Sequence, residues 1–144
     1  MAFRLATFIV CLLLAIPRNS IAGKMLDDAA MDEMHKHFSE AYNRGDLDTM
    51  AATFAENAVR VTPSGIFQGR DAIRRSFSDA LKLGLHDYSV QRTISRPEGT
   101  FVFNAGTWQA KVGDRSFHGY YSSILTSEGG QPKIIEETVA VAAP

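Results

Sequence analysis

Two positions in the C-terminal half of the chain carry side chains suited to acid–base chemistry. His118 has a side chain whose ordinary pKa lies in the working range, although the more common role of a strand-end histidine near the turn at residues 112–115 is merely to be solvated. Glu136 and Glu137 are consecutive on a predicted strand, so their side chains point to opposite faces. A buried carboxylate there could act as a general acid or base, whereas two carboxylates at an edge would stay in water.

The sequence offers little for metal or cofactor chemistry. His35 and His37 are two residues apart on a predicted helix and so do not share a face. Asp28, Asp32 and His35 do share one, but their spacing also fits an ordinary solvated surface. We find no nucleophile elbow, phosphate loop or dinucleotide fingerprint, so we expect no metal and no cofactor.

The N-terminus has the composition of a secretory signal. Residues 1–4 carry one positive charge, residues 5–16 form a short apolar run, and small residues follow before Gly23. We therefore expect residues 1–22 to be a signal peptide cleaved between Ala22 and Gly23, and the protein to be exported, either periplasmic or secreted. The alternative is an uncleaved anchor, but the apolar run is short for a membrane span, so we expect no stable membrane anchor.

The expected mature chain, residues 23–144, is long enough for a single domain. The only cysteine, Cys11, precedes it, so no disulfide can stabilise the fold. Without Arg4 and Arg18 the formal charge falls from −1 to about −3, and no basic run remains. Nucleic-acid binding requires a clustered positive surface, so we expect no nucleic-acid partner.

Hydrophobic periodicity predicts three helices followed by a strand-rich half. Apolar residues recur with helical spacing over residues 26–44, 47–54 and 70–83, with Gly45 at the end of the first helix and Asp46 as the cap of the second. Period-two segments separated by turn formers predict antiparallel hairpins. The predicted strands cover residues 58–62, 88–95, 101–111, 116–126 and 133–141.

Three segments carry a resemblance to a known family: Tyr-Asn-Arg-Gly-Asp-Leu-Asp at 42–48, Phe-Ala-Glu-Asn-Ala-Val at 54–59, and Gly-Arg-Asp-Ala-Ile at 69–73. In this order they resemble the nuclear transport factor 2-like superfamily, which includes SnoaL-like cyclases and ketosteroid isomerases. The resemblance covers residues 26–141. It implies an α+β, cone-shaped fold, in which three N-terminal helices pack on a strongly curved antiparallel sheet around an apolar cavity.

The resemblance does not extend to the isomerase catalytic residues. When the patterns are aligned at Gly-Asp-Leu-Asp, the catalytic tyrosine falls on Phe38, the aspartate base on Thr62 and the second oxyanion donor near Ser122. Phenylalanine has no hydroxyl group and threonine cannot accept a proton near neutral pH, whereas that mechanism needs a base and two donors. We therefore do not expect isomerase activity by that mechanism.

The same alignment implies which side chains enter the cavity. Strand alternation turns Glu137 inward, together with Ala105, Thr107, Gln109, His118, Tyr120 and Ser122. The helices and the rim add Met34, Phe38, Tyr42, Phe54, Thr62 (or Val61), Phe67 and Phe77. Tyr42 and Tyr120 would either hydrogen-bond a ligand oxygen or serve as core aromatics.

The opposite strand phase places Trp108 and Tyr121 on the outer face of the sheet, where we expect a homodimer interface. If Trp108 instead faces inward, the register is wrong by one residue and every pocket assignment inverts.

Two functions are compatible with these patterns. One is an exported small-molecule-binding protein with an apolar pocket for an oxygen-bearing ligand, in which His118 or Glu137 could assist isomerase, cyclase or hydratase chemistry. The other is a non-catalytic binding or dimeric assembly domain whose cavity is packed core.

Overall fold

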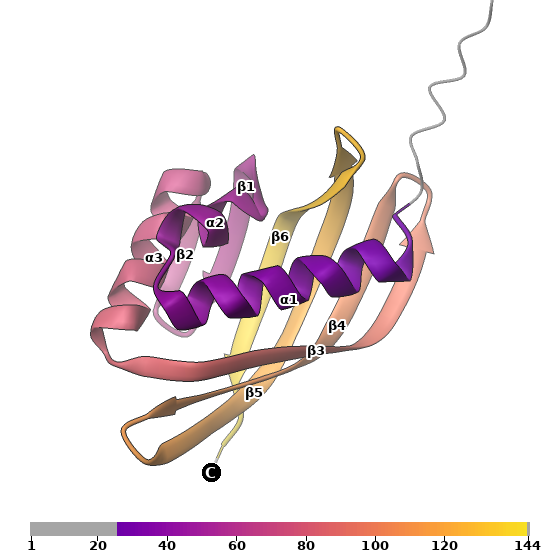
Figure 1. Ribbon diagram of the computed structural model, residues 1–144. Coiled ribbons are helices and arrows are strands. Elements are labelled where there is room, and N and C mark those ends of the chain that lie inside the picture. Colours follow the sequence, from indigo (N-terminus) through magenta and orange to yellow (C-terminus); the bar gives the residue numbers. More distant parts are fainter. Residues whose placement is uncertain (1–25, 144) are drawn as a thin grey trace, which may run out of the picture.

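The computed structural model describes residues 26–143, so the predicted signal peptide and its cleavage site lie outside the described residues. The fold is α+β, with helices packed against one curved six-stranded sheet (Figure 1). The helices are α1 (Asp28–Arg44), α2 (Leu47–Ala52) and α3 (Arg70–Lys82). The strands are β1 (Phe54–Thr62), β2 (Gly65–Gln68), β3 (Leu85–Glu98), β4 (Phe101–Val112), β5 (Arg115–Glu128) and β6 (Gln131–Val141).

Local sequence signals set the helix boundaries. The Asp27 carboxylate accepts a hydrogen bond from the Ala30 amide at 2.8 Å and caps α1. Gly45 ends α1 in the left-handed conformation (φ 69°), and Asp46 caps α2 by accepting from the Thr49 amide. The predicted boundary between these helices is confirmed. The prediction for Phe54 is wrong, because this residue begins β1 instead of lying on α2.

The strand order is β2-β1-β6-β5-β4-β3, and β3 to β6 form the predicted succession of antiparallel hairpins. The sequence did not indicate that β1 pairs in parallel with β6. β1 and β2 lie between α2 and α3, where a strand over residues 58–62 and a turn were predicted.

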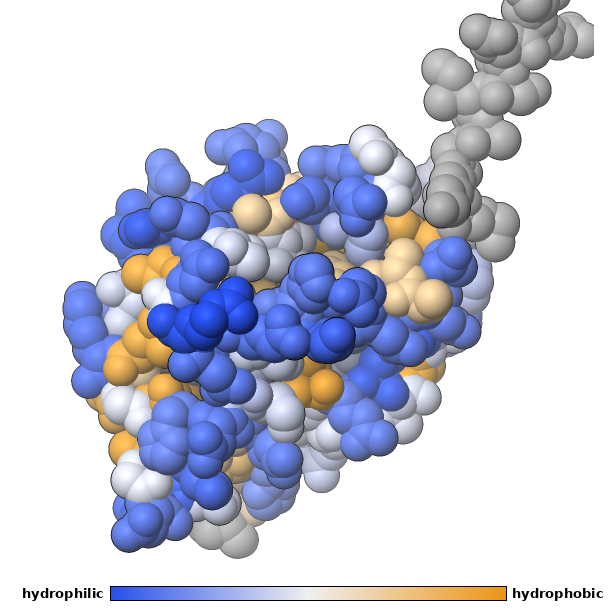
Figure 2. All heavy atoms as spheres, viewed as in Figure 1, coloured by the Kyte–Doolittle hydropathy of each residue, from blue (hydrophilic) through white to orange (hydrophobic). Residues whose placement is uncertain are grey.

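Helix α1 lies across the concave side of the sheet, and α2 and α3 pack together at the end formed by β1 and β2 (Figure 1). The outer surface on this side is mostly hydrophilic, with smaller apolar areas between charged side chains (Figure 2). The core lies beneath the helices. Its largest fully buried side chains are Phe54, Phe77, Met31, Met50, Ile73, Leu125 and Asn104.

The strand phase is opposite to the one that the family alignment implied. Trp108 and Tyr121 are buried on the concave face, and Tyr120 is 60% exposed on the other face. The predicted outer-face positions of Trp108 and Tyr121 are therefore wrong, and these two residues cannot form a dimer interface.

Two glycines allow these aromatic side chains to lie flat on the sheet. In the β4–β5 register Gly106 pairs with Tyr121 and Gly119 pairs with Trp108. A Cβ atom at Gly106 would lie 2.9 Å from Tyr121 Cε1, and one at Gly119 would lie 2.6 Å from Trp108 Nε1. Each aromatic ring thus occupies the space that a side chain on the neighbouring strand would otherwise fill.

Candidate functional site

An internal cavity lies between α1 and the concave face of the sheet. Its volume is about 30 Å³, enough for roughly one or two water molecules. The aromatic part of its wall consists of Phe38, Tyr42, Phe77, Tyr88, Trp108 and Tyr121. The remaining wall consists of His35, Thr53, Val90, Ile134, Glu137 and Val139.

His35 and Tyr121 form the part of the wall where α1 faces β5. Their rings meet edge to face, with centroids 5.7 Å apart. The side chains are 8% and 6% exposed, yet His35 Nδ1 and the Tyr121 hydroxyl have no hydrogen-bond partner among the described residues. Buried polar groups are usually paired, so this corner of the cavity has hydrogen-bonding capacity that the protein itself does not use.

Two further buried polar atoms without partners in the described chain lie on β4 and β5. Asn104 Oδ1 and Ser123 Oγ also lack partners among the described residues. Asn104 and Ser123 are paired across β4 and β5, and the Asn104 amide contacts the sulfur of Met31 on α1. All four buried side-chain atoms that lack a partner in residues 26–143 therefore lie between α1 and the β4–β5 hairpin.

A buried ion pair occupies the opposite side of the cavity. Arg60 Nε donates to Glu137 Oε2 at 2.7 Å, and the two side chains are 14% and 12% exposed. The Arg60 guanidinium also donates to Ser76 Oγ at 3.1 Å and lies 4.4 Å from the centre of the Phe77 ring. Glu137 thus faces the cavity with its charge balanced by a fixed cation.

A side-chain amide fixes the tyrosine wall. Asn43 Nδ2 donates to the Tyr88 carbonyl at 2.9 Å, and the Tyr88 amide donates to Asn43 Oδ1 at 2.7 Å. These bonds hold the irregular start of β3 against the end of α1, where Tyr88 stacks on Tyr42 with ring centres 4.4 Å apart.

Burial keeps His35 and the tyrosines Tyr88 and Tyr121 uncharged near neutral pH. Burial, reinforced by the positive charge of Arg92, lowers the pKa of His35 to about 4, against a weaker opposing effect of Asp32. Burial raises the pKa of Tyr121 and Tyr88, and the negative charge of Glu137 raises both further.

Some of the residues proposed from the sequence do meet at this cavity. Phe38, Tyr42 and Phe77 line it, and so does Glu137. Met34 instead borders a surface hollow between α1, α2 and the β5–β6 turn. Three others are placed away from the cavity wall: Phe54 in the core, Phe67 packed against the core, and Thr62 at the β1–β2 turn.

The strand residues proposed from the family alignment lie on the other side of the sheet. Thr107, Gln109, His118 and Tyr120 line a hollow of about 340 Å³ on the outer face. Ser122 and Ala105 share that face through the same alternation. Their predicted inward orientation is wrong because the strand phase differs by one residue. His118 is consequently separated from the cavity and from Glu137 by the sheet itself.

Sequence reasoning missed the groups that form the cavity's polar corner. His35 was considered only as a metal ligand and Tyr121 only as a dimer contact. A usable signal was present, because Gly106-Thr107-Trp108 and Gly119-Tyr120-Tyr121 each place a glycine two residues before an aromatic. In a hairpin centred on residues 113–114 these segments pair glycine with aromatic on a single face.

The family model of the SnoaL-like domain matches residues 35–137. The chain belongs to the SnoaL-like domain family. The matched part of this SnoaL-like protein runs from His35 to Glu137 and so includes every residue of the cavity wall except Val139. A search of curated proteins finds no match.

Solved structures similar to this SnoaL-like protein support the fold. An NTF2-like protein of unknown function from Shewanella oneidensis MR-1 superposes with a TM-score of 0.69 at 16% identity, covering 77% of this chain and 96% of that one. A ketosteroid isomerase-like protein from Erwinia carotovora atroseptica SCRI1043 gives 0.65 at 14% identity, covering 81% and 96%. At these identities the likeness establishes the fold alone.

Within residues 26–143 no cluster of three or more histidine, cysteine or acidic side chains is placed to hold a metal ion. None of the helices described here combines the length and the apolar character required to cross a membrane.

Proposed function

We propose that this protein binds a small, mostly apolar molecule that carries an oxygen atom, in the cavity between α1 and the concave face of the sheet. The observation that carries the proposal is the unpartnered pair of buried polar groups, His35 Nδ1 and the Tyr121 hydroxyl, at a wall that is otherwise largely aromatic. A few polar groups in an apolar recess are typical of small-molecule sites.

Glu137 is the carboxylate in the cavity wall and could transfer a proton there. Of the two residues that the sequence suggested for acid–base work, it alone lines the cavity, whereas His118 lies on the outer face. Arg60 holds one oxygen of the Glu137 carboxylate, so proton transfer would require that ion pair to loosen. Binding is therefore the function we propose, and isomerase, cyclase or hydratase chemistry at Glu137 would be an extension of it.

The single tryptophan provides a direct test. Trp108 lines the cavity and its indole N–H donates to the Ala140 carbonyl at 3.0 Å, so its indole NMR resonance reports on the cavity. We expect small aromatic fragments to shift this resonance saturably. Val139→Phe should abolish the shift by filling the cavity, whereas Thr138→Phe, on the opposite face of β6, should retain it.

A second candidate function follows from the cavity's volume. Ligand sites usually offer about 300 to 1,000 Å³, far more than the roughly 30 Å³ present here. A non-catalytic domain with a packed cavity would have this property and would associate through its outer sheet face, where Ile94, Phe101 and Tyr120 are exposed. Under this alternative no fragment would move the Trp108 resonance, and Tyr120→Glu would convert a homodimer into monomers in sedimentation experiments.

We also propose that the protein is exported, on the basis of the signal-like composition of residues 1–22. The intact mass of the protein from its own host should correspond to a chain beginning at Gly23. A mass that includes residues 1–22 would contradict cleavage.

A further inference from the structure

The cavity's polar groups make it suited to an uncharged ligand. His35 is neutral near pH 7 because burial lowers its pKa to about 4, and burial keeps Tyr121 and Tyr88 in their neutral forms. The charge on Glu137 is balanced by Arg60 at 2.7 Å. A charged ligand would leave water without meeting a free opposite charge at the wall, which is strongly unfavourable.

The unpartnered groups indicate which neutral function is recognised. A tyrosine hydroxyl can donate and accept one hydrogen bond each, and a neutral imidazole nitrogen does one or the other according to its tautomer. A ligand hydroxyl group is both donor and acceptor, so it can bond to the Tyr121 oxygen and to His35 Nδ1 in either tautomer. An ether oxygen, which only accepts, can satisfy both groups only when Nδ1 carries the proton, and an aromatic hydrocarbon satisfies neither.

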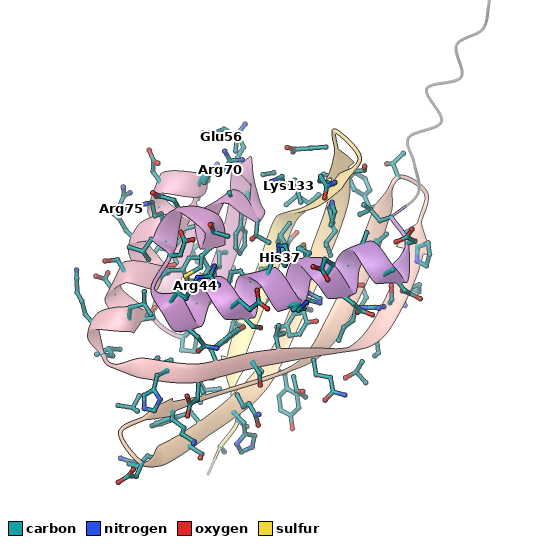
Figure 3. The ribbon with its side chains drawn as sticks, viewed as in Figure 1. His37, Arg44, Glu56, Arg70, Arg75 and Lys133 are labelled. Carbon is teal, nitrogen blue, oxygen red and sulfur yellow. The ribbon has the colours of Figure 1, made fainter. Side chains whose placement is uncertain are left out.

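The remaining wall sets the position of the ligand's body. Thr53 lines both the cavity and the neighbouring surface hollow, whose volume is about 320 Å³. His37 on α1 and Lys133 on β6 border that hollow (Figure 3). We therefore expect the body of a ligand with its hydroxyl group at His35 and Tyr121 to extend past Thr53 towards this hollow, where there is more space.

We infer that the ligand is an uncharged alcohol or phenol whose hydroxyl group lies between Tyr121 and His35. This inference rests on the proposed function, because it specifies the ligand of the same cavity. The apolar body packs against the aromatic wall, and the hydroxyl group provides the hydrogen bonds that the chain itself does not supply.

Four probes of similar size separate the contributions: phenol, anisole, toluene and benzoate, each titrated against the full mature chain at pH 7 while the Trp108 indole resonance is recorded. We expect phenol to bind at least about tenfold more tightly than anisole or toluene, because only phenol donates as well as accepts. We expect benzoate to bind most weakly, because its charge has no free partner.

Matched variants assign the effect to the two residues. Tyr121→Phe and His35→Gln should each reduce the preference for phenol over toluene severalfold while leaving toluene binding in place. Tyr120→Phe removes the same hydroxyl from the opposite face, and His86→Gln changes an exposed histidine on β3 that lines neither the cavity nor the hollow. Both controls should keep the wild-type preference.

The outcomes distinguish the inference from the proposed function. If phenol and toluene bind wild-type protein equally, or if benzoate binds most tightly, the hydroxyl inference is overturned while the cavity remains a binding site. If none of the four probes shifts the Trp108 resonance, both fail. Because the probe series uses wild-type protein, the test does not depend on the variants folding.

Discussion

The two faces of the β4–β5 hairpin carry similar polar side chains, but one face is buried and the other is open to solvent. The concave face buries Asn104, Tyr121 and Ser123 beneath α1, and each has a polar atom without a partner among the described residues. The outer face carries Thr107, Gln109, His118 and Tyr120 around an open hollow.

The difference between the faces shows which polar groups carry functional information. A hydroxyl or amide group in solvent can hydrogen-bond to water. A buried group without a hydrogen-bond partner lowers the free energy of unfolding by about 1 to 3 kcal/mol. The outer residues therefore need no ligand to explain them. The buried row under α1 is unfavourable for the isolated fold, and groups of this kind are retained where another molecule pairs with them.

The largest expected effect comes from forcing a side chain into the concave face. In Gly106→Ala the new Cβ would collide with the Gln91 carbonyl oxygen and approach Tyr121 Cε1 to 2.9 Å. Backbone cannot move aside without disrupting β3, so we expect a loss of about 5 kcal/mol or failure to fold. Thr107→Ala, one residue along and facing outward, should change the free energy of unfolding by less than about 0.5 kcal/mol. Urea denaturation of both variants measures the contrast, and equal midpoints would refute the observed strand phase.

The second largest loss of stability should come from breaking the buried ion pair between Arg60 and Glu137. Glu137→Leu leaves Arg60 charged and largely buried, so the free energy of unfolding should fall by about 4 kcal/mol. Adding Arg60→Met should restore much of that loss, because two apolar side chains can pack without an uncompensated charge.

The exposed pair of Arg74 and Asp48 is the control for this prediction. Its 2.6 Å contact is as short as the buried one, but both groups are largely in solvent. Asp48→Ala should cost about 0.5 kcal/mol or less. Similar losses in thermal or urea unfolding for both pairs would mean that Glu137 is better solvated than its position indicates.

Much of the fold was accessible from the sequence because its signals are local. Helical spacing, the glycine at position 45, the cap at Asp46 and the turns between the hairpins all depend on neighbouring residues. The parallel pairing of β1 with β6 was not accessible, because it joins segments about 75 residues apart and leaves no local pattern.

The site was only partly predictable because both faces of the sheet hold apolar and polar residues. Phe101, Phe103 and Ala105 point outward while Val102, Trp108 and Ala110 point inward, so hydrophobic alternation did not decide the phase. The family alignment supplied a phase and was wrong by one residue. The helix residues Phe38 and Tyr42 were placed correctly, because only one face of α1 is apolar.

Acid should destabilise the protein by protonating His35, which is buried against the concave face. Its folded-state pKa of about 4 lies below the ordinary value of 6.5, so the unfolded chain binds more protons between these limits. The free energy of unfolding therefore has its full contribution from neutral His35 above pH 6.5. This contribution decreases as the pH falls, and below pH 4 the free energy of unfolding is lower by about 3 kcal/mol.

Comparison of variants isolates this contribution from the titration of carboxylates. Arg92 and Asp32 act on His35 in opposite directions and are unchanged in His35→Gln, which should lose the pH dependence assigned to the histidine. His37→Gln removes an exposed histidine and should follow the wild-type curve. Urea unfolding measured from pH 7 to pH 4 would contradict the burial of His35 if wild type and His35→Gln changed in parallel.

The smallest expected change in the free energy of unfolding is that of Tyr121→Phe, and its sign is informative. Removing the Tyr121 hydroxyl eliminates a buried polar group without a protein partner, so Tyr121→Phe should leave the apo protein as stable or raise its free energy of unfolding by about 1 kcal/mol. Tyr120→Phe makes the same change in solvent and should alter stability by less than about 0.3 kcal/mol. A loss of 1 kcal/mol or more in Tyr121→Phe would mean that the hydroxyl is already paired, for example with a bound water. A gain would mean that this hydroxyl is retained at the expense of stability, as expected for a group whose partner is a ligand.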